Sequence, residues 1–368
     1  MASKVYFADF RARTEKENKI QKIKRLFDAL DLSNIISDGD LTAIKIHFGE
    51  QGGDSFINPI FVKPVSDKIK EAGGKPFVTD TNTLYSGSRH NAVDHLMTTI
   101  EHGFSYSVTG APVIISDGLK SENFIDVEIE GKHFKSAKIA GDIVNADSMI
   151  VMSHFKGHGM AGFGGSIKNL AMGCACAEGK KDQHSLRPVV NTKKCAACGK
   201  CIEICPQNAV SMVDGKAHID KELCVGCAEC IAMCEFNSIK LDWSVELEEF
   251  TEKLTEYALG AIKGKENKVA YINFLINITP DCDCVPWSDT PIVPNIGMLV
   301  SFDPVAIDKA SLDLVNEQKP IINSYLDDSE HEDCDHFKRM WKDTKGDIQI
   351  SYGTEIGLGS SEYELVKI

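Results

Sequence analysis

The chain has 368 residues, of which 54 are acidic and 40 are basic, and its formal charge is −14. This acidity disfavours binding to nucleic acid or to an anionic membrane surface, so we expect neither partner. A composition of 43% apolar and 26% charged residues excludes wholesale disorder. No apolar run approaches the roughly 20 residues that span a bilayer, and the first twenty residues carry too many charges for a secretory signal. We therefore expect a cytoplasmic protein.

Short apolar runs alternate with amphipathic helices, which predicts an α/β fold with a largely parallel or mixed sheet. Thr14 and Glu17 have the spacing of a capping box and predict the start of a first helix. Up to residue 187, strands are predicted at 5–7, 41–48, 76–79, 112–115 and 148–153, an edge hairpin near 124–129, and further helices at 59–72 and 91–102.

Polar side chains follow several of these strands. Ligands of open α/β sheets bind outside the carboxyl ends of the strands, so Lys45, His47, Asp80 and Arg89 are candidate site residues. His47 is also a candidate acid–base group, because the reference pKa of histidine lies near neutrality. The alternatives stay open: Lys45 and His47 alternate on a strand and can face solvent or the core, and Asp80 and Arg89 can serve in turns and caps.

A glycine-rich segment at 156–176 follows the strand at 148–153. Glycines crowded between Gly157 and Gly165 precede a predicted helix start, where free backbone N–H groups can bind an anion. The spacing matches neither a Walker A motif nor G-x-G-x-x-G, so it indicates an anionic small molecule without identifying it. The alternative is a tight, close-packed turn. The candidate anion-binding residues of this segment are Lys156, His158, Gly164, Gly165, Ser166, Lys168 and Asn169.

Eight of the thirteen cysteines lie between Cys195 and Cys234. The spacing C-x2-C-x2-C-x3-C occurs twice, 29 residues apart, at Cys195, Cys198, Cys201 and Cys205 and again at Cys224, Cys227, Cys230 and Cys234. This spacing is typical of [4Fe–4S] binding, whereas a zinc ribbon would leave half of these thiols unused. Between the copies, Asp214 and Gly215 predict a type I′ hairpin.

Residues 188–242 resemble the bacterial two-cluster ferredoxin, although Glu235 replaces the proline that follows the first copy. The resemblance implies two [4Fe–4S] clusters, one held by Cys195, Cys198, Cys201 and Cys234 and the other by Cys224, Cys227, Cys230 and Cys205. We therefore expect a small α+β ferredoxin insert at 188–242 that splits an α/β host domain into residues 1–187 and 243–368. The second part of the host is predicted to contain a helix at 245–262, strands near 268–274 and 297–302, and a helix at 304–318.

Four further cysteines form two Cys-x-Cys pairs, Cys174/Cys176 and Cys282/Cys284. Isolated cysteines are usually inert core residues. Two pairs beside Gly, Asp and Pro predict more: if they converge, they form either a redox-active relay or a four-thiolate site for a third metal.

The segments 156–176, 282–290 and 297–308 resemble the iron–sulfur proteins grouped as domain of unknown function 362, which often carry an inserted ferredoxin. The likeness spans nearly the whole chain. It implies a cytoplasmic cluster protein of the kind common in anaerobic bacteria and archaea, and it implies no settled reaction.

Our leading hypothesis is an iron–sulfur oxidoreductase that receives electrons from a redox partner protein and relays them to an anionic substrate on the host. Lys156, His158 and Lys168 would bind or protonate that substrate. A ferredoxin-like electron carrier without enzymatic activity and a metal or cluster maturation factor are the alternatives.

Overall fold

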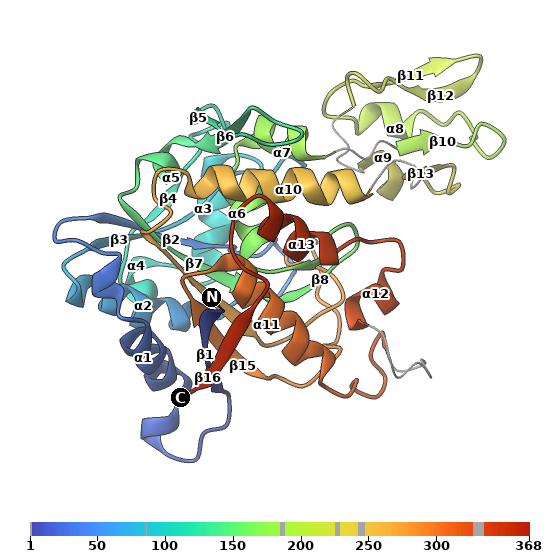
Figure 1. The fold of residues 1–368 in the computed structure, drawn as a ribbon. Helices are drawn as coiled ribbons and strands as arrows, with labels where there is room; N and C mark the ends of the chain where they lie inside the picture. Colours follow the sequence, from blue (N-terminus) through green and yellow to red (C-terminus); the bar gives the residue numbers. More distant parts are fainter. Residues whose placement is uncertain (1, 86, 185–187, 225–228, 242–246, 327–334) are drawn as a thin grey trace.

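The computed structural model describes residues 2–85, 87–184, 188–224, 229–241, 247–326 and 335–368. Its centre is one mixed eight-stranded sheet (Figure 1), which confirms the predicted α/β class. In spatial order its strands are β16 (Tyr363–Lys367), β1 (Ser3–Asp9), β15 (Gly297–Ser301), β14 (Val269–Leu275), β7 (Ser148–His154), β2 (Leu41–Ile46), β3 (Lys75–Asp80) and β4 (Val113–Ile115).

Five neighbouring strands, β14, β7, β2, β3 and β4, run parallel, so their carboxyl ends lie along one edge of the sheet. β15 pairs antiparallel with both β14 and β1. From β2 the chain continues to β3 on one side, while β7 lies on the other side of β2. The strand order therefore reverses between β2 and β7, the position where open α/β sheets bind their ligands.

Helices cover both faces of this sheet, which explains why its central strands are apolar on both sides. Ile44 and Ile150 pack into the core below α1 and α2, whereas Ala43 and Val151 pack into the core with α6, α10 and α11. The helices are α1 (Lys19–Leu30), α2 (Val62–Glu71), α3 (Ala92–Glu101), α4 (Tyr106–Thr109), α5 (Gly141–Asn145), α6 (Ser166–Cys174), α7 (Ala177–Gln183), α8 (Lys200–Glu203), α9 (Glu229–Ala232), α10 (Leu247–Ile262), α11 (Pro304–Asn316), α12 (His336–Met340) and α13 (Asp347–Glu355).

The start of the first helix differs from the prediction. Thr14 caps only the 3-10 turn Glu15–Glu17 and makes no side-chain cap bond. α1 begins after Asn18, whose side chain accepts a hydrogen bond from the Gln21 amide at 3.0 Å. Asparagine is as good an N-cap as aspartate or serine, and Asn18 is the residue whose side chain caps α1.

Outside the large sheet, the described residues form four two-stranded sheets. In the host body these are β5 (Phe124–Glu128) with β6 (Ser136–Ala140), and β8 (Lys156–His158) with β9 (Gly162–Gly164). The weakly patterned end of the chain adds α12, α13 and β16, and β16 pairs parallel with β1 at the sheet edge. Two short 3-10 turns, Leu32–Asn34 and Pro59–Phe61, complete the body.

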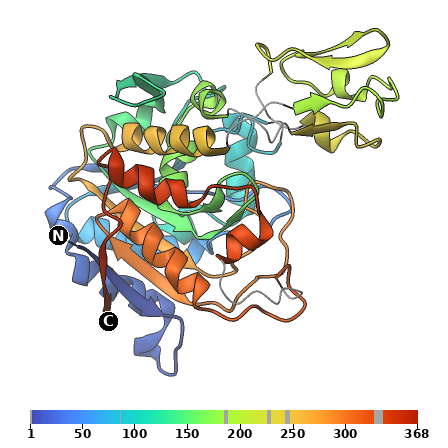
Figure 2. The same ribbon diagram turned by 45° about the vertical axis from the view of Figure 1, so that its right-hand side comes forward.

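Residues 188–241 form a small cysteine-rich unit that projects from the body in both views (Figures 1 and 2). Its first strand, β10 (Pro188–Val190), pairs antiparallel with its last, β13 (Ile239–Leu241). β11 (Val210–Val213) and β12 (Lys216–Ile219) form a hairpin whose turn residues Asp214 and Gly215 have φ of 50° and 70°. These positive values are those of the predicted type I′ turn.

In the described part of the chain, no helix combines the length and the hydrophobicity that crossing a bilayer requires.

Candidate functional site

A cavity in the cysteine-rich unit brings together three cysteines of the first motif and one of the second. Cys195, Cys198 and Cys201 line it from one loop, and Cys234 lines it from the other. The remaining wall is largely apolar and is formed by residues of both copies, namely Ala196, Ala197, Gly199, Lys200, Met212, Ala217, Met233, Phe236, Ser238 and Ile239. Four thiols around one cavity can ligate a metal cluster.

Backbone amides point at these sulfurs. Ala217 N–H donates to Cys195 Sγ at 3.5 Å, and Ser238 N–H donates to Cys234 Sγ at 3.3 Å. The Ala217 bond lowers the pKa of Cys195; burial alone would raise the pKa of Cys234, but the bonds from Ser238 lower it. Thiolates are the ligating form of cysteine, so this donor set fits an iron–sulfur cluster.

The second ligand set is only partly described. Cys224 and Cys230 are buried in the core of the unit, and Cys205 Sγ accepts a hydrogen bond from the Ala209 amide at 3.2 Å. Cys227 lies outside the described residues.

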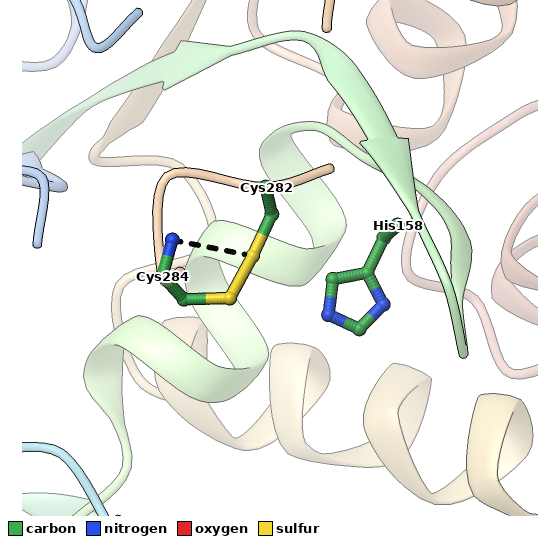
Figure 3. A group of neighbouring side chains, drawn as sticks. All are labelled: His158, Cys282 and Cys284. Carbon is green, nitrogen blue, oxygen red and sulfur yellow. Dashed lines mark hydrogen bonds between the residues drawn. A yellow bond between two sulfur atoms is a disulfide. The ribbon is translucent and has the colours of Figure 1, made fainter. Parts of the chain in front are cut away.

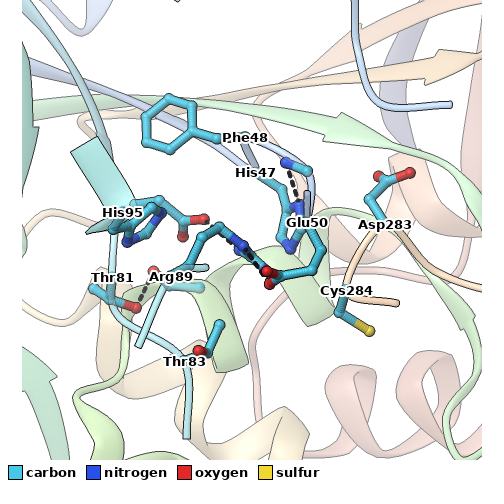
Figure 4. Close-up of polar contacts among 12 residues, drawn as sticks. His47, Phe48, Glu50, Thr81, Thr83, Arg89, His95, Asp283 and Cys284 are labelled. Carbon is cyan, nitrogen blue, oxygen red and sulfur yellow. Dashed lines mark hydrogen bonds and ion pairs between the residues drawn. The ribbon is translucent and has the colours of Figure 1, made fainter. Parts of the chain in front are cut away.

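In the host body, charged side chains gather where β2, β3 and β7 end (Figure 4). Lys45 on β2 is fully buried, and its Nζ lies 2.9 Å from Asp80 Oδ1 at the end of β3. The same Nζ donates to Asn169 Oδ1 on α6 at 2.7 Å. Burial alone would raise the pKa of Asp80, but Lys45 and its other cationic neighbours hold that pKa well below its usual range. The buried pair therefore ties two strands to the helix that follows β7.

Arg89 extends this network toward the loop after β14. Its Nε lies 3.0 Å from Glu50 Oε2, and its NH2 donates to the Tyr85 hydroxyl at 2.8 Å. That hydroxyl in turn donates to the Cys284 carbonyl at 2.9 Å. Arg89 lies in a turn, as one alternative predicted, and its buried side chain also links three loops.

A second carboxylate, Asp283, is held on the β7 side. His154 Nδ1 lies 2.9 Å from Asp283 Oδ2, and Ser55 Oγ donates to Asp283 Oδ1 at 3.0 Å. Lys156 Nζ lies 3.6 Å from the same carboxylate and donates to the His154 carbonyl at 2.9 Å. Burial alone would raise the pKa of Asp283, but His154 and Lys156 hold it well below its usual range.

Lys156 and Lys168 lie next to each other over Gly164. A Cβ at Gly164 would lie 3.3 Å from Lys168 Cδ and 3.5 Å from Lys156 Nζ, so the missing side chain makes room for both stems. Burial lowers the pKa of Lys168 to about 7, and the neighbouring positive charge of Lys156 adds to this shift. Within the described ranges Lys168 Nζ has no ion-pair partner. The cluster holds as many carboxylates as basic side chains, since Glu50, Asp80, Asp283 and Asp308 accompany Lys45, Arg89, Lys156 and Lys168.

His47 lies between the two halves of the cluster. Its Nδ1 accepts a hydrogen bond from the Gly49 amide at 3.0 Å. Burial lowers the pKa of His47 well below its ordinary value, and Arg89 adds to this effect. Burial beside a guanidinium thus disfavours the imidazolium of His47, and the predicted acid–base role of His47 stays a prediction.

Cys282 and Cys284 form a disulfide in the loop after β14, and the His158 ring points toward it (Figure 3). The two sulfurs and a ring nitrogen of His158 all lie within 4.8 Å of one another. His158 Nδ1 accepts hydrogen bonds from the amides of Met160 at 3.2 Å and Ala161 at 3.0 Å. Its position is fixed by the tight β8–β9 hairpin.

The other Cys-x-Cys pair does not join this group. Cys174 and Cys176 are free thiols, both fully buried, and burial raises the pKa of Cys174 to about 11. Cys176 caps α7 by accepting a bond from the Gly179 amide at 3.5 Å. The predicted four-thiolate metal site is therefore not formed. Cys282 and Cys284 are joined in a disulfide, whereas Cys174 is packed in the core and Cys176 caps α7.

The glycine-rich segment also differs from the expectation. The Ser166 and Ile167 amides at the start of α6 donate to the two carboxylate oxygens of Asp308 at 2.7 and 2.9 Å. A Cβ at Gly165 would lie 2.4 Å from that carboxylate. These amides thus bind a carboxylate of the protein itself, and the missing side chain of Gly165 lets that carboxylate approach. Ligand binding by Gly164 stays a prediction.

Several residues of the site were missed by sequence reasoning, namely Glu50, Tyr85, His154, Asp283 and Asp308. Asp283 lies between two cysteines and His154 directly follows a predicted strand, so their positions carried a signal. Asp308 ends the segment 297–308, but its contact with the Ser166 amide depends on the packing of α11 against α6, which the sequence does not specify.

The sequence profile described as "Domain of unknown function (DUF362)" matches residues 42–313. No curated protein matches the chain. Among solved structures, the lactate racemase apoprotein from Thermoanaerobacterium thermosaccharolyticum is similar, with 14% sequence identity and a TM-score of 0.39. The alignment covers 74% of this chain and 51% of that one, so the chain spans about half the length of that protein.

Proposed function

The chain belongs to the DUF362 family, and we propose that it is an iron–sulfur oxidoreductase with two [4Fe–4S] clusters and an anionic small-molecule site on its host body. The observation that carries the proposal is the cavity shared by Cys195, Cys198, Cys201 and Cys234. Three ligands from one motif and the fourth from the other is the arrangement of a two-cluster ferredoxin.

The residues of the unit would hold the clusters by their thiolates, with the amides of Ala217 and Ser238 stabilising the negative charge on sulfur. Hydrogen bonds to the ligating sulfurs are among the factors that set the reduction potential of such a cluster. When bound, the clusters supply one-electron transfer with an external redox partner protein.

The host residues would supply the anion site. Lys156 and Lys168 present two adjacent ammonium groups at the switch point of the sheet, and Lys168 lacks an ion-pair partner within the described ranges. A bound carboxylate, phosphate or sulfate group would compensate this positive charge. With a pKa of about 7, Lys168 can also give a proton to the substrate near neutral pH. His47 and His158, whose pKa values are well below the ordinary value, would act as neutral hydrogen-bonding groups.

The experiment is anaerobic purification followed by iron and sulfide analysis and electron paramagnetic resonance of the reduced protein. We expect about eight iron atoms per chain, as two cubanes require, and signals from two interacting clusters. Preparations with zinc in place of iron, or with iron well below this amount after reconstitution, would contradict the cluster assignment.

The anion site is tested separately, with sulfate as the probe. Sulfate should raise the melting temperature of the wild-type protein, because ligand that binds the folded state stabilises it. Lys156→Met should remove the shift and leave the iron content unchanged, while the exposed Lys319→Met serves as the matched control. An unchanged sulfate shift in Lys156→Met defeats the anion assignment.

A further inference from the structure

We propose that the Cys282–Cys284 disulfide is a reversible two-electron redox centre whose reduced form is stabilised by a hydrogen bond from His158 Nε2. This inference goes beyond the proposed function, because the centre can be reduced by a dithiol and needs no cluster. It rests on the disulfide, on the hydrogen bonds that orient His158, and on the unequal burial of the two sulfurs.

The tautomer of His158 follows from its contacts. The Met160 and Ala161 amides both donate to Nδ1, so Nδ1 carries no proton. Burial lowers the pKa of His158 well below its ordinary value, so the ring is neutral and its single proton lies on Nε2. In Figure 3 the His158 ring faces the disulfide, and a ring nitrogen lies within 4.8 Å of both sulfurs. Nε2 is therefore the ring nitrogen that can donate a hydrogen bond to a sulfur of the reduced pair.

The two sulfurs have different surroundings. Cys282 is 5% exposed, and its Sγ already accepts a hydrogen bond from the Cys284 amide at 3.4 Å, whereas Cys284 is half-buried. An incoming thiolate reaches Cys284 more easily, and Cys282 is the better leaving group because its thiolate is stabilised by the amide. A thiolate gains more from such donors than a disulfide sulfur does.

The reaction balances with a dithiol as reductant. Its thiolate attacks Cys284 Sγ, the Sγ–Sγ bond breaks, and Cys282 leaves as a thiolate that accepts the His158 Nε2–H bond. The second thiol of the reductant loses its proton to solvent and attacks the mixed disulfide. The Cys284 sulfur that it displaces takes up a proton from solvent. The dithiol is oxidised to a disulfide by two electrons, and the pair is reduced to one thiolate and one thiol.

Asp283 lies between the two cysteines in sequence but does not repel this thiolate at close range. Its carboxylate is engaged by His154 and Ser55, on the other side of the loop. Lys156 and Lys168 are the charged groups that most lower the pKa of His158, so positive charge lies beside the ring that donates to the sulfur. Both features favour the reduced state.

The test uses full-length, cluster-loaded protein equilibrated anaerobically with mixtures of reduced and oxidised dithiothreitol. Differential alkylation and mass spectrometry then report the redox state of the peptide that carries Cys282 and Cys284. We expect one two-electron transition in the wild type. The buried Cys174 and Cys176 should remain thiols throughout and react only after denaturation, which makes them an internal control.

The role of His158 is tested by His158→Leu. Loss of the donor should lower the equilibrium constant for reduction about tenfold, which is a potential roughly 30 mV more negative for a two-electron couple. His158→Gln, whose amide can still donate, should recover part of this shift, and the exposed His90→Leu should leave the potential unchanged.

Two results overturn the proposal: cysteines 282 and 284 that stay unpaired under oxidising conditions, or a His158→Leu potential equal to that of the wild type. The wild-type titration decides the first point even if a variant fails to fold. Because iron analysis is independent of this titration, failure of the cluster assignment is distinguishable from failure of the disulfide assignment.

Discussion

The host body and the cysteine-rich unit differ in what can hold them folded. The host buries an apolar cluster on each face of an eight-stranded sheet. The described core of the unit is far smaller, and Cys195, Cys201, Cys224 and Cys230 are themselves part of it. So small a core buries too little apolar surface to offset the conformational entropy of its chain. The host has a core large enough to fold by itself, whereas we expect the fold of the unit to depend on the ligands that its cysteines would bind.

The largest expected effect separates the two regions by removing a cluster ligand. Cys234→Ser should reduce the iron content from about eight atoms to about four, because this residue would complete the ligand set of one of the two proposed clusters. Metal-binding free energy is folding free energy in such units, so hydrogen exchange should accelerate within 188–241. Exchange in β2, β7 and β14 should stay unchanged, and Ser211→Ala, exposed on β11, is the control. Loss of protection in the sheet would show that the two regions are not independent.

The second prediction concerns the stability of the host body alone. Lys45→Met leaves Asp80 buried without its nearest cation, and removing one partner of a buried ion pair costs about 3–5 kcal/mol. Urea unfolding followed by circular dichroism measures the loss, while the iron content should not change. Lys63→Met breaks an exposed pair with Asp67 and should cost less than about 1 kcal/mol. Equal losses in the two variants would contradict the assigned role of the buried pair.

The third prediction is a pH dependence confined to the host. The pKa of Lys168 is lowered to about 7, so this residue is mostly charged at pH 6 and mostly neutral at pH 8. Sulfate should therefore bind about tenfold more tightly at pH 6, a ratio set by the charged fraction of one group titrating near 7. His47 and His158 stay neutral in this range, because their pKa values are lowered well below the ordinary value.

The same shift has a consequence for folding. The unfolded chain retains the ordinary, higher pKa of lysine and binds more protons, so the contribution of Lys168 to stability increases as the pH rises above 7. Lys168→Met should remove the pH dependence of sulfate binding and the contribution of Lys168 to the pH dependence of stability, which isothermal titration calorimetry and thermal unfolding at pH 6 and 8 measure. Asp308, whose pKa burial raises to about 6, keeps its own contribution to stability in the variant. A sulfate affinity that stays flat in the wild type between these values excludes Lys168 as the titrating group.

The smallest predicted effect concerns the beginning of α1. Asn18→Ala removes the side-chain bond to the Gln21 amide and should cost about 1 kcal/mol of host stability. Thr14→Ala should be close to neutral, because Thr14 makes no side-chain cap bond. Chemical denaturation of both variants checks the pair, and the reverse ranking would restore the capping box predicted from sequence.

A feature can be predicted from the sequence when the residues that determine it lie close together along the chain. The hairpin at Asp214 and Gly215 was predictable, because a two-residue turn is a local property of the backbone. The α/β class was predictable from the alternation of apolar strands and amphipathic helices, and it is confirmed. The capping box failed because two neighbouring residues, Thr14 and Asn18, compete for one helix start.

The host site was predictable only in outline. The rule that ligands bind at carboxyl ends of strands selected Lys45, His47 and Lys156, which the structure does bring together. The redox state of the Cys-x-Cys pairs was not predictable, because identical spacing occurs at a helix end for Cys174 and in a loop for Cys282. The hydrogen bond from the Ser166 amide to Asp308 was not predictable either, because the two residues lie 142 positions apart in the sequence.

The pairing of β10 with β13 places Pro188 opposite Leu241. The first and last strands of the cysteine-rich unit thus lie side by side. A gene segment that encodes the unit can therefore be gained, lost or exchanged at one position of the host. A lineage that lost this segment would keep the complete eight-stranded sheet, since each of its strands lies before Pro188 or after Leu241. The prediction for comparative genomics is a set of relatives that retain the host residues and lack all eight motif cysteines.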